Sequence, residues 1–92
     1  MEIKIWNKGQ LTNTFLMLER IVLHKGTYQK ELVRKNKWKT DVDSIGALLD
    51  KGLITRKKVK AIYRVYPTKK GIREYEKAYE KWRKEVNPTF IN

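Results

Sequence analysis

The segment spanning residues 53–66 constrains the fold more than any other part of this sequence. Two stretches rich in β-branched and aromatic residues, Leu53–Arg56 and Ala61–Tyr66, flank the basic stretch Lys57–Lys60. This pattern predicts two antiparallel strands with residues 57–60 as the hairpin connection. Pro67 has no amide hydrogen to give to a ladder, so the second strand should end there. The chain is therefore expected to contain a small β-hairpin.

Two helical segments are predicted in the first third of the chain. Apolar residues spaced three and four apart predict a helix from Leu11 to His24, with Thr12 or Asn13 as its N-cap. A second, short and basic helix is expected to begin at Thr27, because its hydroxyl can cap the first free amides. The residues of this second helix expected to face the core are Tyr28, Leu32 and Val33.

A third helix is predicted after a turn at residues 36–39. Thr40 or Asp41 is expected to cap it, and Gly52 to end it. Trp38, in the turn, is expected to seal the core between two helices. The residues predicted to form the inner face of the third helix are Val42, Ile45, Leu48 and Leu49.

The two ends of the chain are predicted to form an N-terminal arm or strand and a long C-terminal helix. Residues 1–9 are expected to form an arm or a short strand, in which Ile3 and Ile5 alternate with charged neighbours. Residues 69–87 are predicted to be a long helix that Thr68 caps. One face of this helix carries Ile72, Tyr75, Tyr79, Trp82 and Val86. Such a narrow apolar seam, together with Ile3 and Ile5, favours pairing with a second copy of the chain, and the alternative for the seam is packing onto the chain's own first helix.

Length and composition exclude several classes of protein. Ninety-two residues allow one domain, residues 1–92. With no cysteine and His24 as the single histidine, we expect no disulfide, no metal centre, no cofactor and no enzymatic activity. No apolar run approaches the length of a membrane span, and the N-terminus does not resemble a signal peptide. We therefore expect an unprocessed protein in the cytoplasm or host cell interior, with no membrane partner.

The charge of the chain indicates a polyanionic partner. The formal net charge is +12 at pH 7. Between Asp50 and Glu74 there is no acidic residue. The basic residues in that interval are Lys51, Arg56, Lys57, Lys58, Lys60, Arg64, Lys69, Lys70 and Arg73. A second basic cluster, around the turn into the third helix, contains Lys30, Arg34, Lys35, Lys37 and Lys39. Such clusters are typical of proteins that bind nucleic acid.

Two stretches resemble the signatures of winged helix-turn-helix transcriptional regulators. Residues 48–56 read LLDKGLITR and residues 63–71 read YRVYPTKKG. The resemblance is greatest to the MarR and PadR families, and to small regulators encoded by archaeal viruses and plasmids. It covers Leu11 to about Val86 and departs from the family at Pro67, where leucine is usual, and in a shorter wing. It implies a mainly α fold with a small β-hairpin (α+β) and a long C-terminal dimerisation helix.

The resemblance also implies where DNA would bind. The recognition helix and its turn would contact DNA through Lys37, Lys39, Thr40, Asp41, Asp43 and Ser44. The wing would use Arg56, Lys57, Lys58, Lys60 and Arg64, and further backbone contacts would come from Lys30, Arg34 and Lys35. Asp41 has two open interpretations, as an N-cap or as an acceptor for cytosine N4. The dimer interface would be the seam of the last helix.

Two functions in different classes follow from these observations. The first is a homodimeric, sequence-specific regulator of transcription that binds double-stranded DNA, with the third helix in the major groove and the wing on the backbone or minor groove. The alternative is an architectural or DNA-partition protein that coats DNA with little sequence specificity, which the acidic residues of the third helix would suit. Whether a small-molecule effector acts on the protein is not determined by the sequence.

Overall fold

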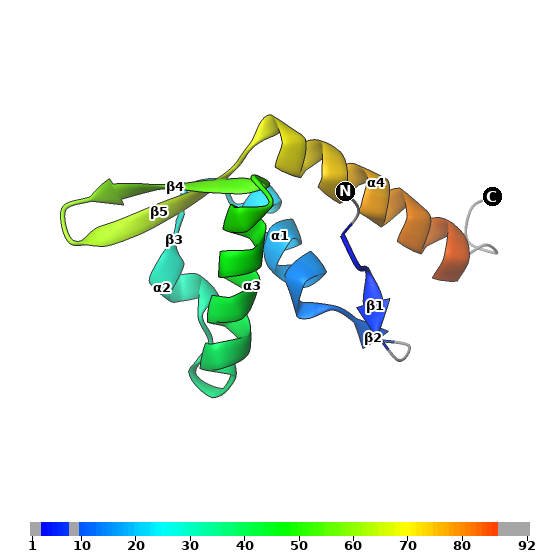
Figure 1. Cartoon of the computed structure of the whole chain (residues 1–92), viewed down its shortest axis with the longest axis horizontal. Helices are drawn as coiled ribbons and strands as arrows, with labels where there is room; N and C mark the ends of the chain where they lie inside the picture. The colour runs from blue at the N-terminus through cyan, green and yellow to red at the C-terminus, as the bar shows by residue number, and fades with distance from the viewer. Residues whose placement is uncertain (1–2, 8–9, 87–92) are drawn as a thin grey trace.

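Helices and short strands alternate along the chain in the computed structural model, which describes residues 3–7 and 10–86 (Figure 1). The elements are β1 (Trp6–Asn7), β2 (Gln10–Leu11), α1 (Asn13–Leu23), β3 (Thr27–Tyr28), α2 (Gln29–Leu32), the 3₁₀ turn η1 (Lys35–Lys37), α3 (Trp38–Asp50), β4 (Ile54–Val59), β5 (Ile62–Pro67) and α4 (Lys69–Val86). The structure is mostly helical with small antiparallel sheets, which confirms the predicted fold class.

The larger sheet has the strand order β3-β5-β4 and is antiparallel throughout. The hairpin of β4 and β5, residues 54–67, is the wing. It is longer than predicted, because residues 57–59 belong to β4 and the turn consists of Lys60 and Ala61 alone. Lys60 adopts a φ of 60°, as tight hairpin turns require. The lysines of β4 are exposed to solvent, so their charge does not oppose strand pairing.

Hydroxyl caps begin two of the helices, as predicted. The amide of Phe15 donates to Thr12 Oγ1 at 3.2 Å at the start of α1. The amide of Gly71 donates to Thr68 Oγ1 at 2.9 Å at the start of α4. These bonds satisfy amides that have no partner inside the helix, and they set where each helix starts.

The second and third helices begin at different residues from those predicted. Thr27 does not cap a helix, because Thr27 and Tyr28 pair with β5 as the short strand β3, and α2 starts only at Gln29. Conversely, α3 begins at Trp38 directly after η1, and neither Thr40 nor Asp41 caps it. Pairing across more than thirty residues decided the first boundary, and such pairing is not visible in a local pattern.

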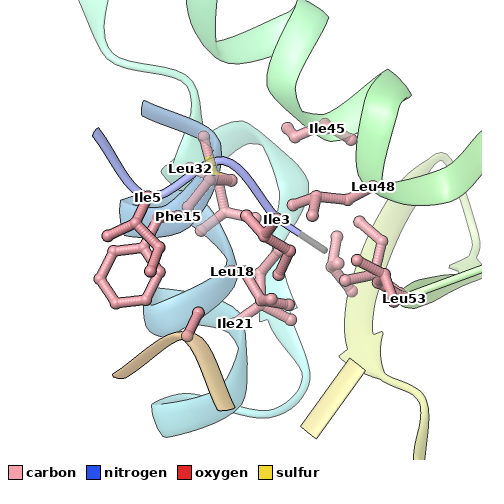
Figure 2. Close-up of a cluster of buried hydrophobic side chains, with 13 residues drawn as sticks. Ile3, Ile5, Phe15, Leu18, Ile21, Leu32, Ile45, Leu48 and Leu53 are labelled. Carbon is pink, nitrogen blue, oxygen red and sulfur yellow. The ribbon is translucent and has the colours of Figure 1, made fainter. Parts of the chain in front are cut away.

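The core lies around α1, which packs against α3 on one side and α4 on the other (Figure 1). Figure 2 shows Ile45 and Leu48 of α3 in the same buried cluster as Phe15 and Leu18 of α1. The buried hydrophobic residues are Ile3, Ile5, Phe15, Met17, Leu18, Ile21, Leu32, Ile45, Leu48, Leu53, Ile54, Val65 and Ala78. The wing projects from this core on the side away from α4 (Figure 1).

The N-terminal segment belongs to the core of the single chain. Ile3 and Ile5 are buried, and they line a small cavity together with Ala78 of α4. The amide of Thr12 donates to the carbonyl oxygen of Ile5 at 2.7 Å, which fixes the segment beside α1. The prediction that these isoleucines contribute to a seam between copies is therefore wrong, because the chain's own α4 covers them.

Candidate nucleic-acid interface

The wing presents a positively charged surface. Arg56, Lys57, Lys58 and Lys60 are exposed, and β4 is buried only at Ile54. Successive side chains of a strand point to opposite faces, so the lysines flank the wing on both sides. The structure thus brings these four predicted residues together on one projecting hairpin.

The two arginines of the wing differ in their surroundings. Arg56 is exposed, donates from Nη1 to Gln29 Oε1 at 3.0 Å, and lies 4.5 Å from the ring centroid of Tyr63. Arg64 is half-buried and donates to the carbonyl oxygen of Gly26 at 3.2 Å and to the hydroxyl of Tyr28 at 2.7 Å. Arg64 therefore ties β3 to the wing, a role that the sequence did not indicate.

Asp41 is fully buried and belongs to a hydrogen-bonded network between α1 and α3. Its Oδ2 accepts from the backbone amide of Arg34 at 2.8 Å, and its Oδ1 accepts from Arg34 Nη2 at 2.8 Å and from Asn13 Nδ2 at 3.0 Å. The Arg34 guanidinium, with the amide of Asn13, holds the pKa of Asp41 well below its usual range. Ser44, also buried, accepts from Asn13 Nδ2 at 2.9 Å.

This network corrects two predictions for α3. Asp41 and Ser44 were expected to face a DNA groove, and both instead point to the interior. Asp41 is neither an N-cap nor an exposed acceptor for a base. Arg34 was predicted to contact the DNA backbone. Its guanidinium instead donates hydrogen bonds to Asp41 and Asn13 within the chain, which leaves fewer of its N–H groups for DNA.

The opposite change affects Trp38 and Val42. Both were predicted to face the core, yet Trp38 is 64% exposed and Val42 is 38% exposed. The reason is the rotation of α3. Asp41 occupies the inward position beside Ile45, so Val42 turns toward solvent, and Trp38 follows it because residues four apart share a helix face.

The other predicted residues of α3 and the preceding turn lie on the surface. Lys37, Lys39, Thr40 and Asp43 are exposed, and so are Lys30 and Lys35. Lys39 Nζ lies 3.7 Å from Asp43 Oδ2, so the two charges partly compensate each other. The outer surface of α3 is therefore less basic than the wing.

A groove lies between α2, α3 and the tip of the wing, and its volume is about 530 Å³. It is lined by Gln29, Lys30, Val33, Trp38, Val42, Ala61, Ile62 and Tyr63. We call it the α3–wing groove. The sequence did not indicate this groove, because Trp38 was expected in a turn and Val42 on the inner face of the helix; with α3 beginning at Trp38, the two residues are four apart on one helix face.

Part of the apolar seam of α4 packs against α1 of the same chain. The ring of Tyr75 stacks on Phe15 at 5.7 Å between centroids, and its hydroxyl donates to Glu19 Oε2 at 2.8 Å. Burial, together with this hydrogen bond, raises the pKa of Tyr75. Tyr75 therefore packs onto α1 of its own chain, as the second of the two predictions for the seam stated. Tyr79 remains 38% exposed.

The other described members of the seam differ in exposure. Ile72 and Trp82 are half-buried, and the ring centroids of Tyr79 and Trp82 are 5.7 Å apart. The side chain of Val86 lies outside the described residues. The exposed part of the seam is thus centred on Tyr79.

Within residues 3–7 and 10–86, no group of three or more His, Cys, Asp or Glu side chains is placed to hold a metal ion. Of the helices that the structure describes, none combines the length and the apolar character needed to cross a bilayer.

Comparison with known proteins places the fold. No family model and no curated protein matches the sequence. Among solved structures, the chain is similar to a MarR transcriptional regulator from Methanosarcina mazei Go1, with a TM-score of 0.67 and 26% identity over 87% of this chain and 62% of that one. It is similar to SSV1 F-93, with a TM-score of 0.64 and 16% identity over 88% of this chain and 99% of that one.

A third structure gives the same result. It is a protein of unknown function from Listeria innocua Clip11262, with a TM-score of 0.59 and 26% identity over 89% of this chain and 65% of that one. The chain thus spans less than two thirds of the length of the Methanosarcina and Listeria proteins. These likenesses show that the chain has the winged helix-turn-helix fold, as the sequence resemblance implied.

Proposed function

We propose that this protein binds double-stranded DNA as a homodimer and regulates transcription. In this proposal α3 enters the major groove, and the wing lies on the adjacent backbone or minor groove. The observation that carries the proposal is the exposed wing, whose basic residues Arg56, Lys57, Lys58 and Lys60 project beside α3 in a fold shared with a MarR transcriptional regulator.

Electrostatics supports DNA as the partner. Each phosphate that a lysine or arginine neutralises releases a bound counterion, and this release supplies much of the affinity of DNA-binding proteins. The wing and the exposed residues Lys30, Lys35, Lys37 and Lys39 provide these charges. Contacts of this kind position a protein on the duplex, and residues of α3 would then contact base edges.

The dimer would form through α4. Tyr79 is 38% exposed, the ring of Trp82 lies next to its ring, and Trp82 and Ile72 are half-buried. Pairing of two α4 helices about a two-fold axis would cover these rings and place both α3 helices on one side of the assembly. Half-sites would then lie about 34 Å apart, one turn of the duplex.

Binding is expected to be the whole activity. Regulators of the MarR kind are not enzymes. The proposed role needs no cofactor or metal ion, and it places the protein in the compartment that contains the DNA.

An architectural, DNA-coating role is the second candidate, and one observation favours it. Asp43 and Asp50 are exposed on α3, and the helix contains no Arg, Asn or Gln, the residues that most often read guanine and adenine. A coating protein needs few base contacts, because backbone contacts supply its affinity.

Selection of bound duplexes from a random pool, followed by footprinting, tests the proposal. A regulator should enrich a palindrome and protect one or two discrete sites. A coating protein should enrich no sequence and give a continuous, spreading footprint. Absence of duplex binding at low salt would contradict both functions.

A further inference from the structure

We propose that Trp38 and Val42 read thymine through its C5-methyl group in the major groove. This inference rests on the proposed function, since it names the base feature that α3 would recognise. It assigns specificity to two residues that sequence patterns place in the core.

Helix α3 lacks most of the side chains that read bases by paired hydrogen bonds. Bidentate hydrogen bonds to guanine come from Arg or Lys, and those to adenine come from Asn or Gln. The sequence of α3, WKTDVDSIGALLD, contains no Arg, Asn or Gln, and the ammonium group of Lys39 lies beside Asp43. Hydrogen-bonded readout by this helix is therefore limited, and Asp41 and Ser44 are withdrawn into the interior.

Helix α3 instead exposes two large hydrophobic side chains. Trp38 and Val42 are one turn apart and are among the exposed large hydrophobic residues of the described chain. They form one wall of the α3–wing groove, and Val33 and Ile62 lie in the same groove. On a helix that enters the major groove, contact between this apolar surface and an apolar group of a base would be favourable, because it removes apolar area from water.

The charge around the α3–wing groove is positive. Among its lining residues, all within the described chain, none is acidic, and Lys30 is one of them. Arg56 contacts both Gln29 and Tyr63, which line the groove as well. Positive charge beside an apolar wall fits a ligand that is anionic at its edge and carries apolar groups inside, as a major groove does where it contains thymine.

The thymine methyl is the base group that satisfies these conditions. Among the base edges exposed in the major groove, it is apolar, and the others donate or accept hydrogen bonds. Removing one such methyl from water should change affinity by roughly fourfold, since one buried CH₂ contributes about 0.8 kcal/mol. Several methyls per site would multiply this effect.

Replacement of thymine by deoxyuridine tests the proposal directly. The probe is the duplex selected by the protein from a random pool, compared with the same duplex in which every thymine is deoxyuridine. The replacement removes the methyl group and leaves the pairing and the charge unchanged. We expect about fourfold weaker binding for each contacted methyl, and a dimer with one contact per half-site should lose about 16-fold.

Two variants distinguish readout from general binding. Val42→Thr has nearly the same shape but a hydroxyl, and Trp38→Ala removes the ring; both should reduce the thymine-to-deoxyuridine affinity ratio. Lys57→Gln should weaken binding to both duplexes equally and keep the ratio. Both Trp38 and Val42 are exposed, so the variants should fold, which circular dichroism checks.

The possible outcomes separate this inference from the proposed function. Equal affinity of the wild-type protein for the two duplexes would overturn the inference and leave duplex binding intact. A ratio that Trp38→Ala and Val42→Thr do not change would also overturn it. Tighter binding to single-stranded DNA than to the duplex would indicate base stacking on Trp38 and contradict methyl readout. Failure to bind any duplex would refute the proposed function itself.

Discussion

Arg34 holds the buried carboxylate of Asp41 from both its backbone and its side chain. The Arg34 amide and Nε donate to Asp41 Oδ2 at 2.8 and 3.1 Å, and Nη2 donates to Oδ1 at 2.8 Å. The pair connects the segment before α3 to the first turns of α3. It therefore contributes to the rotation of the helix, which decides whether Trp38 and Val42 face the solvent.

Removal of the Asp41 charge should destabilise the protein at neutral pH. Asp41→Asn loses charge-assisted hydrogen bonds from Arg34, and we expect the free energy of unfolding to fall by about 1.5–3 kcal/mol. Urea denaturation measures this change. Asp43→Asn is the matched control, because Asp43 is exposed and its ion pair with Lys39 should contribute less than about 1 kcal/mol. Equal effects of the two substitutions would contradict the structural role of Asp41.

The same pair predicts how stability depends on pH. The folded protein holds the pKa of Asp41 below its unfolded value, so the unfolded chain takes up the proton first as the pH falls. The contribution of the carboxylate is complete above about pH 3.9 and decreases below it, toward the folded pKa. The stability difference between wild type and Asp41→Asn should therefore shrink on acidification. A difference that stays constant down to about pH 2 would show that the Asp41 charge is not linked to folding.

Charge on the wing should control affinity for every DNA sequence alike. If a dimer neutralises about eight phosphates, the logarithm of the binding constant should fall with the logarithm of salt concentration with a slope of roughly −7. Replacing both Lys57 and Lys58 with Gln should flatten this slope. The matched control replaces Lys81 and Lys84, which belong to the C-terminal part of α4. The C-terminal end of α4 points away from the wing (Figure 1). A similar loss in both variants would indicate non-local attraction and not contact by the wing.

A charged residue at the exposed part of the α4 seam should separate the proposed dimer. Tyr79→Glu places a carboxylate where pairing would bury it, which is unfavourable. Because Tyr79 is 38% exposed, the variant should fold, sediment as a monomer and lose operator affinity while keeping weak non-specific binding. Leu23→Glu, at a residue of α1 that is 63% exposed, is the control. A wild-type protein that is monomeric at roughly tens of micromolar, the scale of a moderate dimer, would refute the dimer.

Two glycines should respond to alanine in opposite directions. A Cβ at Gly71 would overlap the backbone carbonyl oxygen of Leu53, and neither backbone segment can move easily. Gly71→Ala should therefore reduce the free energy of unfolding by about 3 kcal/mol or more. A Cβ at Gly46 meets no atom within 4 Å, and Gly46→Ala should stabilise α3 by about 0.4–1 kcal/mol. Thermal unfolding compares both variants with the wild type. An unaffected Gly71→Ala would contradict the close approach of α4 to Leu53.

Local patterns in the sequence determined that the helices α1 to α4 and the wing hairpin exist. The apolar spacing of α1 and α4, the caps at Thr12 and Thr68, and the position of Pro67 depend on neighbours a few residues away, so they could be predicted correctly. The basic character of the wing also followed from the sequence. Lysine and arginine side chains with no acidic residue near them in the chain are almost always exposed, because burial of an unpaired charge is unfavourable.

Only the tertiary structure decided which way α3 faces. The preference of an aspartate for solvent and of a valine for the core argued for Asp41 outside and Val42 inside, and both predictions were wrong. Arg34 and Asn13, distant partners in the chain, supply hydrogen bonds that compensate the burial of Asp41. The pairing of Thr27 with Val65 and the burial of Ile3 beside α4 are decided in the same way. Local propensities amount to a few tenths of a kcal/mol per residue, and a satisfied buried charge or a completed strand pair outweighs them.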